Sequence, residues 1–218
     1  MTMNSRFAQN ATLSLLVTSL FAGVPVAAAQ AQTAPAASES SASAPAAPIQ
    51  GLYDALKTAQ TTGKTAQQRA TMIAPAVDHA FDLEAILRRS VGVRYNNLSA
   101  ADRTRLLGSF RQFTIARYAS SFKPGSNAVF TILPQTRPNP TGGQIVDTTI
   151  GGGSDGGTPI DYIMTSGPSG WRITDILLDA HISQVAAQRA DFGGALSQGG
   201  ASGLADLLDR KTTKFLHD

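Results

Sequence analysis

The sequence predicts an α+β domain in which helices pack on one face of an antiparallel sheet of about four strands. Three observations lead to this prediction. Apolar residues recur with helical periodicity over residues 49–122, alternate with period two over residues 129–176, and return to helical periodicity after residue 183. This separation of helices from strands along the chain is typical of α+β folds.

Helices account for the first half of the predicted domain. The first has a one-sided apolar stripe that starts at Ile49. The second opens with a capping box at Thr65, and Pro75 is expected to kink or end it. A short helix follows the N-cap residue Asp82, and the longest helix follows Ser99.

The second half switches to the alternation of apolar and polar residues that marks strands. The connections between these strands are short, which favours an antiparallel meander. The connection between the second and third strands, Gly151–Gly157, is rich in glycine. Strands are expected over residues 129–133, 145–150, 160–165 and 171–176, and closing helices over about residues 183–197 and 202–216.

Residues 1–29 have the features of a cleavable secretory signal peptide. Arg6 gives a weakly positive start, and the apolar stretch Ala11–Val24 follows it. Small residues then allow cleavage after Ala29 or Ala31. The apolar stretch is shorter than the about 20 residues of a membrane-spanning helix, although an uncleaved anchor is the alternative interpretation.

Residues 30–48 consist almost entirely of Ala, Ser, Gln, Thr and Pro. Such a segment has too little apolar surface to offset the entropy of ordering, so we expect a disordered tether. Residues 49–218 then form one folded domain of ordinary size.

Composition and motifs exclude several classes of protein. The chain has no cysteine, which excludes disulfides, cysteine metal sites and cysteine nucleophiles. Removal of the signal peptide takes away Arg6 and leaves 17 basic against 15 acidic residues, and this near-neutral balance argues against a nucleic-acid binder. The three histidines lack metal-site spacing, and His181 beside Asp179 is interpreted as an exposed turn pair. We therefore expect no catalytic residue, no metal and no cofactor.

Two groups of residues have more than one possible role. Apolar side chains of the helices either fill a core or line a cavity between the helices and the sheet. A cluster of arginines is either a set of solvated helix faces or a surface for an anionic headgroup or an acidic partner. The two groups are Phe81, Ile86, Leu87, Phe110 and Phe113, and Arg88, Arg89, Arg94, Arg103, Arg105, Arg111 and Arg117.

Several short patterns occur in one order and spacing along the chain. They include Phe81-Asp82-Leu83-Glu84, the segment Leu87–Gly92, Phe110-Arg111-Gln112-Phe113 and the segment Gly170–Ile176. Together they make the chain resemble the MlaC / toluene-tolerance family of periplasmic lipid-binding proteins. The tail from Asp179 to Phe192 is more similar to the hopanoid-biosynthesis-associated (HpnM) branch of that family.

The resemblance implies a curved sheet with an apolar cavity between the sheet and the helices. It also implies a soluble, monomeric, non-enzymatic shuttle in the periplasm. Such a shuttle carries phospholipid or hopanoid between an inner-membrane lipid transporter complex and an outer-membrane acceptor.

The resemblance also suggests which residues bind lipid and which meet the headgroup or a partner. The cavity lining is expected to include Phe81, Ile86, Val91, Phe110, Phe113, Tyr118, Ile132, Ile163 and Ile173. The headgroup or partner surface is expected to include Arg88, Arg89, Arg94 and Arg117.

Two alternative functions remain open at this level. A small cone-shaped α+β enzyme would place an acid or base in an apolar pocket, and a raised pKa on a cavity-facing carboxyl would favour it. An envelope adaptor that binds no lipid would have a filled core. The candidate acids and bases for the enzyme are Asp147, Asp161, Asp175 and Tyr162.

Overall fold

The computed structural model describes residues 44–151 and 156–217. The predicted signal peptide with both cleavage sites, and most of the glycine-rich connection, lie outside these residues. Only residues 44–48 of the predicted tether are described. The last two of these, Ala47 and Pro48, already belong to the first helix, so the helix begins earlier than predicted. The helices are α1 (Ala47–Thr62), α2 (Ala66–Ala80), α3 (Leu83–Val91), the 3-10 helix η1 (Gly92–Asn97), α4 (Ala100–Ser121) and α5 (Gln184–Leu216).

The strands form one open antiparallel sheet in the order β1-β2-β3-β4-β5. The predicted meander is confirmed for the four long strands, and the fifth strand has two residues and pairs with the end of β4. β1 continues beyond the predicted strand, because pairing resumes at Thr136 after an irregularity that begins at Ile132. The strands are β1 (Val129–Pro138), β2 (Gln144–Gly151), β3 (Thr158–Gly167), β4 (Gly170–Leu178) and β5 (Ile182–Ser183).

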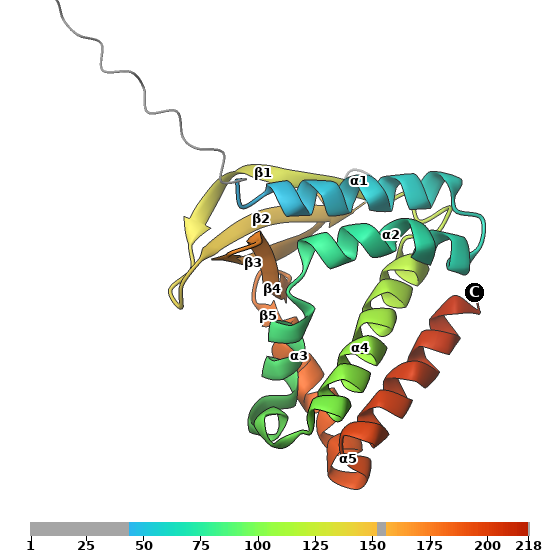
Figure 1. Ribbon diagram of the computed structural model, residues 1–218. Helices are drawn as coiled ribbons and strands as arrows, with labels where there is room; N and C mark the ends of the chain where they lie inside the picture. The colour runs from blue at the N-terminus through green and yellow to red at the C-terminus, as the bar shows by residue number, and fades with distance from the viewer. Residues whose placement is uncertain (1–43, 152–155, 218) are drawn as a thin grey trace, which may run out of the picture. The chain divides into compact units, whose positions relative to one another are not determined.

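The helices cover one face of this sheet, as the sequence predicted. Figure 1 shows α1 and α2 side by side next to the sheet, with α3, α4 and α5 extending together from that layer. The stripe of α1 is fully buried at Ile49, Leu52 and Leu56. Because one face of the sheet meets these helices, the main core lies between the two layers.

The starts of three helices follow from their capping residues. Thr65 and Gln68 form a complete capping box at α2. The Asp82 carboxylate accepts a hydrogen bond from the amide of Ala85 at 2.9 Å, which caps α3. The Ser99 hydroxyl accepts one from the amide of Asp102 at 3.0 Å, which caps α4.

Pro75 was expected to kink or end α2. It does not end the helix, because α2 continues through Pro75 to Ala80. The proline ring removes one backbone donor. The fully buried side chains of Ile73 and Val77, on either side of Pro75, hold the helix against the core. Packing therefore outweighs the local preference.

The segment before α3 closes one edge of the sheet. The amide of Asp82 donates to the carbonyl of Ile173 at 2.9 Å, and Phe81 forms a parallel bridge with Ile173. This contact fixes α3 beside β4. Within the described part of the chain, no helix has the length and apolar character needed to cross a membrane.

Candidate functional site

A cavity of about 170 Å³ lies between the sheet and helices α3, α4 and the start of α5. Its lining is mainly aromatic and aliphatic. Leu83 and Ile86 of α3 line the cavity, together with Phe81, which lies two residues before that helix. The cavity therefore sits where the closed edge of the sheet meets the helical layer.

Helix α4 provides the longest wall of the cavity. Its lining residues recur three and four positions apart, so they share one helical face. From Phe110 to Phe122 this face extends about 18 Å at the rise of an α-helix. The residues are Phe110, Phe113, Thr114, Arg117, Tyr118, Ser121 and Phe122.

The opposite wall comes from alternate residues of the sheet. Ile160 and Tyr162 of β3 line the cavity, so the residues between and after them, Asp161 and Ile163, point to the other face. Neighbouring strands contribute Ile150, Ile176 and Leu178 in the same way. The first turn of α5 completes the wall with Gln184, Val185 and Gln188.

Five residues predicted to line a cavity do line it: Phe81, Ile86, Phe110, Phe113 and Tyr118. Ile86 is on α3, the next three are on α4, and Phe81 lies two residues before α3. Helical periodicity accounts for Ile86 on α3 and for the three residues of α4, whereas Phe81 is positioned by its bridge with Ile173.

The other four predicted lining residues lie elsewhere. Val91 borders a separate surface groove beside Arg94. Ile132 packs against the core, and Ile173 is fully buried at the bridge with the segment before α3. Ile163 is on the face of β3 that points away from the cavity, because period two indicates alternation without indicating which set faces inward.

Sequence reasoning missed the contributions of the sheet and of α5. The alternation of Ile160 and Tyr162 is visible in the sequence, but Ile163 is the residue of this strand that was expected to bind lipid, and Tyr162 was considered only as an acid or base. The polar residues Gln184 and Gln188 are four positions apart at the start of a helix, so they share a face. Their polarity concealed this role, since an apolar lining was expected.

Arg117 is separated in space from the other three arginines predicted to form a docking surface. It lines the cavity. Arg89 donates to the carbonyl of Thr174 at 3.3 Å, and Arg94 donates to the hydroxyl of Ser197 at 3.1 Å. Arg88, Arg89 and Arg94 are exposed on α3 and η1.

The guanidinium of Arg117 meets an amide oxygen. With the Gln184 amide oriented to satisfy both groups, its oxygen accepts from Nη1 of Arg117 at 2.5 Å and from Nη2 at 3.2 Å. Among the described residues, no carboxylate forms an ion pair with Arg117. The guanidinium of Arg117 is therefore hydrogen-bonded to a neutral partner, and its positive charge is not neutralised by an ion pair.

Asp175 also lines the cavity, but its carboxylate serves the start of α5. One oxygen accepts from the amides of Ile176 and Val185, at 2.7 and 3.1 Å. The other accepts from the hydroxyl of Ser183 at 2.6 Å. This carboxylate thus fixes the turn between β4 and the helix.

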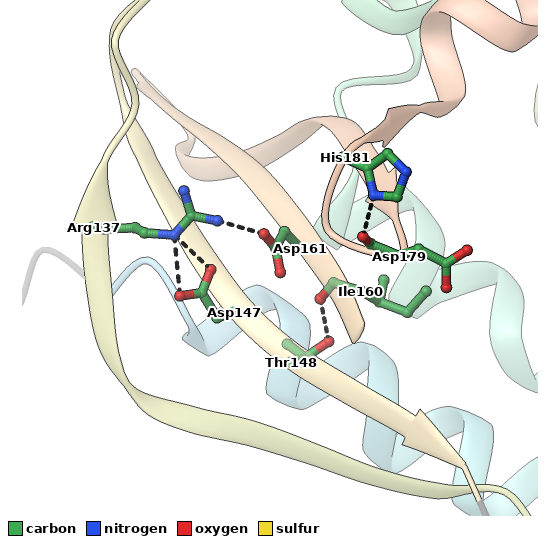
Figure 2. Close-up of polar contacts among 7 residues, drawn as sticks. All are labelled: Arg137, Asp147, Thr148, Ile160, Asp161, Asp179 and His181. Carbon is green, nitrogen blue, oxygen red and sulfur yellow. Dashed lines mark hydrogen bonds and ion pairs between the residues drawn. The ribbon is translucent and has the colours of Figure 1, made fainter. Parts of the chain in front are cut away.

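The remaining carboxylates proposed for an enzyme lie on the other face of the sheet. Figure 2 shows Arg137 between Asp147 and Asp161. Nε of Arg137 donates to Asp147 at 3.0 Å, and the same guanidinium pairs with Asp161. Burial and the charge of Asp147 raise the pKa of Asp161, while Arg137 opposes that shift. The raised pKa therefore belongs to a carboxyl that faces away from the cavity.

His181 and Asp179 do not form a dyad through their side chains. Nδ1 of His181 lies 2.5 Å from the backbone carbonyl oxygen of Asp179, and both residues are exposed (Figure 2). This agrees with their interpretation as a turn pair.

Two tyrosines, Tyr118 and Tyr162, line the cavity, and Tyr53 is buried outside its lining. Thr148 donates its hydroxyl hydrogen to the carbonyl of Ile160 at 2.6 Å (Figure 2), so the Tyr53 hydroxyl donates to Thr148 at 2.7 Å. Burial raises the pKa of Tyr118, and burial raises the pKa of Tyr162 well above its usual value. These groups are therefore neutral hydroxyls in the folded protein.

These features define a small α+β domain with an apolar cavity between its helices and its sheet. The sequence model of the family described as MlaC protein matches residues 47–210, and the chain belongs to this family. Among solved structures, the phospholipid-binding protein from Ralstonia solanacearum in complex with a phospholipid is similar, with a TM-score of 0.64 and 19% identity. The match covers 78% of this chain and 97% of that chain, which shows a shared fold. No curated protein matches the sequence.

Proposed function

We propose that this protein binds a lipid in the cavity and carries it through the periplasm between an inner-membrane transporter complex and an outer-membrane acceptor. The main support is an apolar cavity with one long helical wall, together with membership of the MlaC family. The similar structure that contains a phospholipid adds support for this class of ligand.

The dimensions of the cavity wall suit a hydrocarbon chain. The lining face of α4 is about 18 Å long. One leaflet of a bilayer has a hydrocarbon layer of about 15 Å, half of the full thickness. A chain taken from one leaflet is therefore comparable in length to this wall.

The cavity has to widen when a chain enters. A cavity of about 150 Å³ holds one benzene molecule. At about 170 Å³, the cavity of this protein is much too small for a whole acyl chain. We therefore propose that α4 and the first turns of α5 move away from the sheet during loading.

The energetic need for such a carrier is large. Exposing hydrocarbon to water costs about 0.8 kcal/mol per CH₂, so a chain of about 14 carbons faces roughly 11 kcal/mol. A cavity that covers the chain removes most of this barrier. Phospholipid is our first expectation for the cargo and hopanoid the second, and identification of the extracted lipid distinguishes them.

Neither alternative function has a specific observation in its favour. The one acid among the described lining residues, Asp175, has both oxygens engaged by hydrogen bonds, which argues against an acid–base enzyme. An adaptor with a filled core does not account for the cavity. We propose that the protein is neither.

Partner docking is proposed for the exposed arginines Arg88, Arg89 and Arg94. If they meet an acidic partner, association with the transporter complex should weaken steeply as salt is added. Binding measured at low and high salt for the wild type and for Arg94→Gln tests this. Affinity that is unchanged by salt would indicate an apolar interface.

Lipid binding in the cavity can be tested by filling it. We expect Leu178→Trp to reduce lipid extracted from liposomes about tenfold or more, because the indole would occupy space that the hydrocarbon chain needs. Leu177→Trp is the matched control, since Leu177 lies between two lining residues of β4 and faces the other way.

Both variants are compared with the wild type by bound lipid and by urea unfolding. Equal extraction by Leu178→Trp and the wild type, with both folded, would place the lipid outside this cavity. Loss of extraction in Leu177→Trp alone would point to the opposite face of the sheet.

A further inference from the structure

We propose that Arg117 binds the anionic group of the ligand, a phosphate or a carboxylate, while the apolar part of the same molecule occupies the cavity. This inference rests on the proposed lipid-binding function and adds the charge class of the cargo. It assigns Arg117 to the ligand and separates it from the exposed arginines of α3 and η1.

The position of Arg117 is the first reason. Among the described residues that line the cavity, it is the one cationic side chain, and Asp175 is the one acid. The Asp175 carboxylate is already occupied by two backbone amides and a hydroxyl. An anion that enters the cavity therefore has a single cation to meet.

The partner of Arg117 is the second reason. Two other arginines of the same helix bind carboxylates: Arg111 pairs with Asp78 through two hydrogen bonds of 2.6 Å, and Arg105 pairs with Asp206 at 2.5 Å. Arg117 instead has the neutral amide oxygen of Gln184. A neutral partner leaves the charge available to an anion.

The geometry of the guanidinium fits the proposed ligand. Nη1 and Nη2 of Arg117 both donate to the single oxygen of Gln184, and the same two donors can bind two oxygens of a phosphate or carboxylate. An anion that displaces the Gln184 oxygen replaces a neutral acceptor by a charged one. Phe113 and Tyr118, on the same helix, line the adjoining apolar wall.

The test compares two amphiphiles with the same acyl chain and different charge. We expect the wild type to bind lysophosphatidic acid more tightly than the matching monoacylglycerol. Arg117→Gln should weaken binding of the anionic amphiphile about 10- to 100-fold and leave the neutral one within about twofold. Arg210→Gln, at an exposed arginine of α5 outside the cavity lining, is the matched control and should change neither affinity.

A second variant covers the case in which Arg117→Gln fails to fold. Gln184→Glu would give Arg117 an ion-pair partner at the same position, and it should weaken binding of the anionic amphiphile while Arg117 itself is retained. Binding of both amphiphiles at wild-type affinity by these variants would overturn the inference. Binding of neither amphiphile by the wild type would instead overturn the proposed function.

Inorganic phosphate alone distinguishes an amphiphile site from a free-phosphate site. We expect millimolar phosphate to leave the monoacylglycerol bound and to compete only weakly with lysophosphatidic acid. If phosphate binds as tightly as lysophosphatidic acid, in a manner that Arg117→Gln abolishes, the apolar chain plays no part and the inference is wrong.

Discussion

The tyrosines show how single residues connect the fold to the cavity. Tyr53 of α1 anchors its helix to the sheet through a hydrogen bond with Thr148. Tyr118 of α4 and Tyr162 of β3 line opposite walls of the cavity. Each hydroxyl lies in surroundings that disfavour charge. The polar parts of the lining are therefore neutral at physiological pH, apart from Arg117 and Asp175.

This burial predicts a loss of stability at alkaline pH. All four tyrosines have a pKa above the usual value, with burial as the main cause. Above about pH 10 the unfolded chain releases protons that the folded protein retains, so the free energy of unfolding should fall as pH rises. Urea unfolding from about pH 9 to about pH 11 measures this fall.

Tyr162→Phe is the control for this effect and should make the fall less steep. Tyrosinate absorbance gives an independent reading of the folded protein. If the tyrosines of the folded wild type titrate near pH 10, as free tyrosine does, the description of the buried hydroxyls is wrong.

Single residues also show what the sequence could predict of the site. Phe110 and Phe113 reach the cavity because they share one stripe of α4, whereas Phe81 lies outside the helices and reaches it through its bridge with Ile173. Ile163 was assigned to the wrong face because both sets of alternating residues in β3 include apolar side chains. The set that faces inward is decided by tertiary packing, which a single strand does not contain.

At the scale of elements, α5 consists of two helical parts that meet at Gly200. Gly200 has φ 59° and ψ −150°, a backbone conformation that belongs essentially to glycine. The prediction of two helices was right because Gly199 and Gly200 separate two apolar stripes. The length of β1 was not predicted, since Pro134 lies within it and prolines normally mark the end of a strand.

The kink predicts opposite effects for two neighbouring substitutions. Gly200→Ala should lower the free energy of unfolding by about 1–3 kcal/mol, because alanine is strained in this conformation. Gly199→Ala should leave stability unchanged or raise it by up to about 1 kcal/mol, because alanine favours the helix.

The pair is well matched, since both glycines are exposed and an added Cβ would meet nothing within 4 Å at either position. The two substitutions therefore differ in backbone conformation alone. Urea unfolding of both variants is the measurement, and equal stability would show that the kink at Gly200 is absent in solution.

At the scale of the whole molecule, the fold class and the family were predictable, whereas the cavity followed only from the family resemblance and not from local patterns. The order of helices, strands and helices determined the α+β arrangement, and local patterns in fixed spacing indicated the MlaC family. An apolar helix face has the same periodicity whether it meets a packed core or an open space. The cavity depends on how far α4 and the start of α5 lie from β3 and β4, which no local pattern encodes.

The central claim is that this cavity holds a lipid, and native mass spectrometry of the protein purified from membranes tests it most directly. We predict that the wild type is recovered with bound lipid and that Leu178→Trp, folded to the same extent, is recovered without it. Recovery of the folded wild type free of lipid, with no uptake from liposomes, would contradict the account.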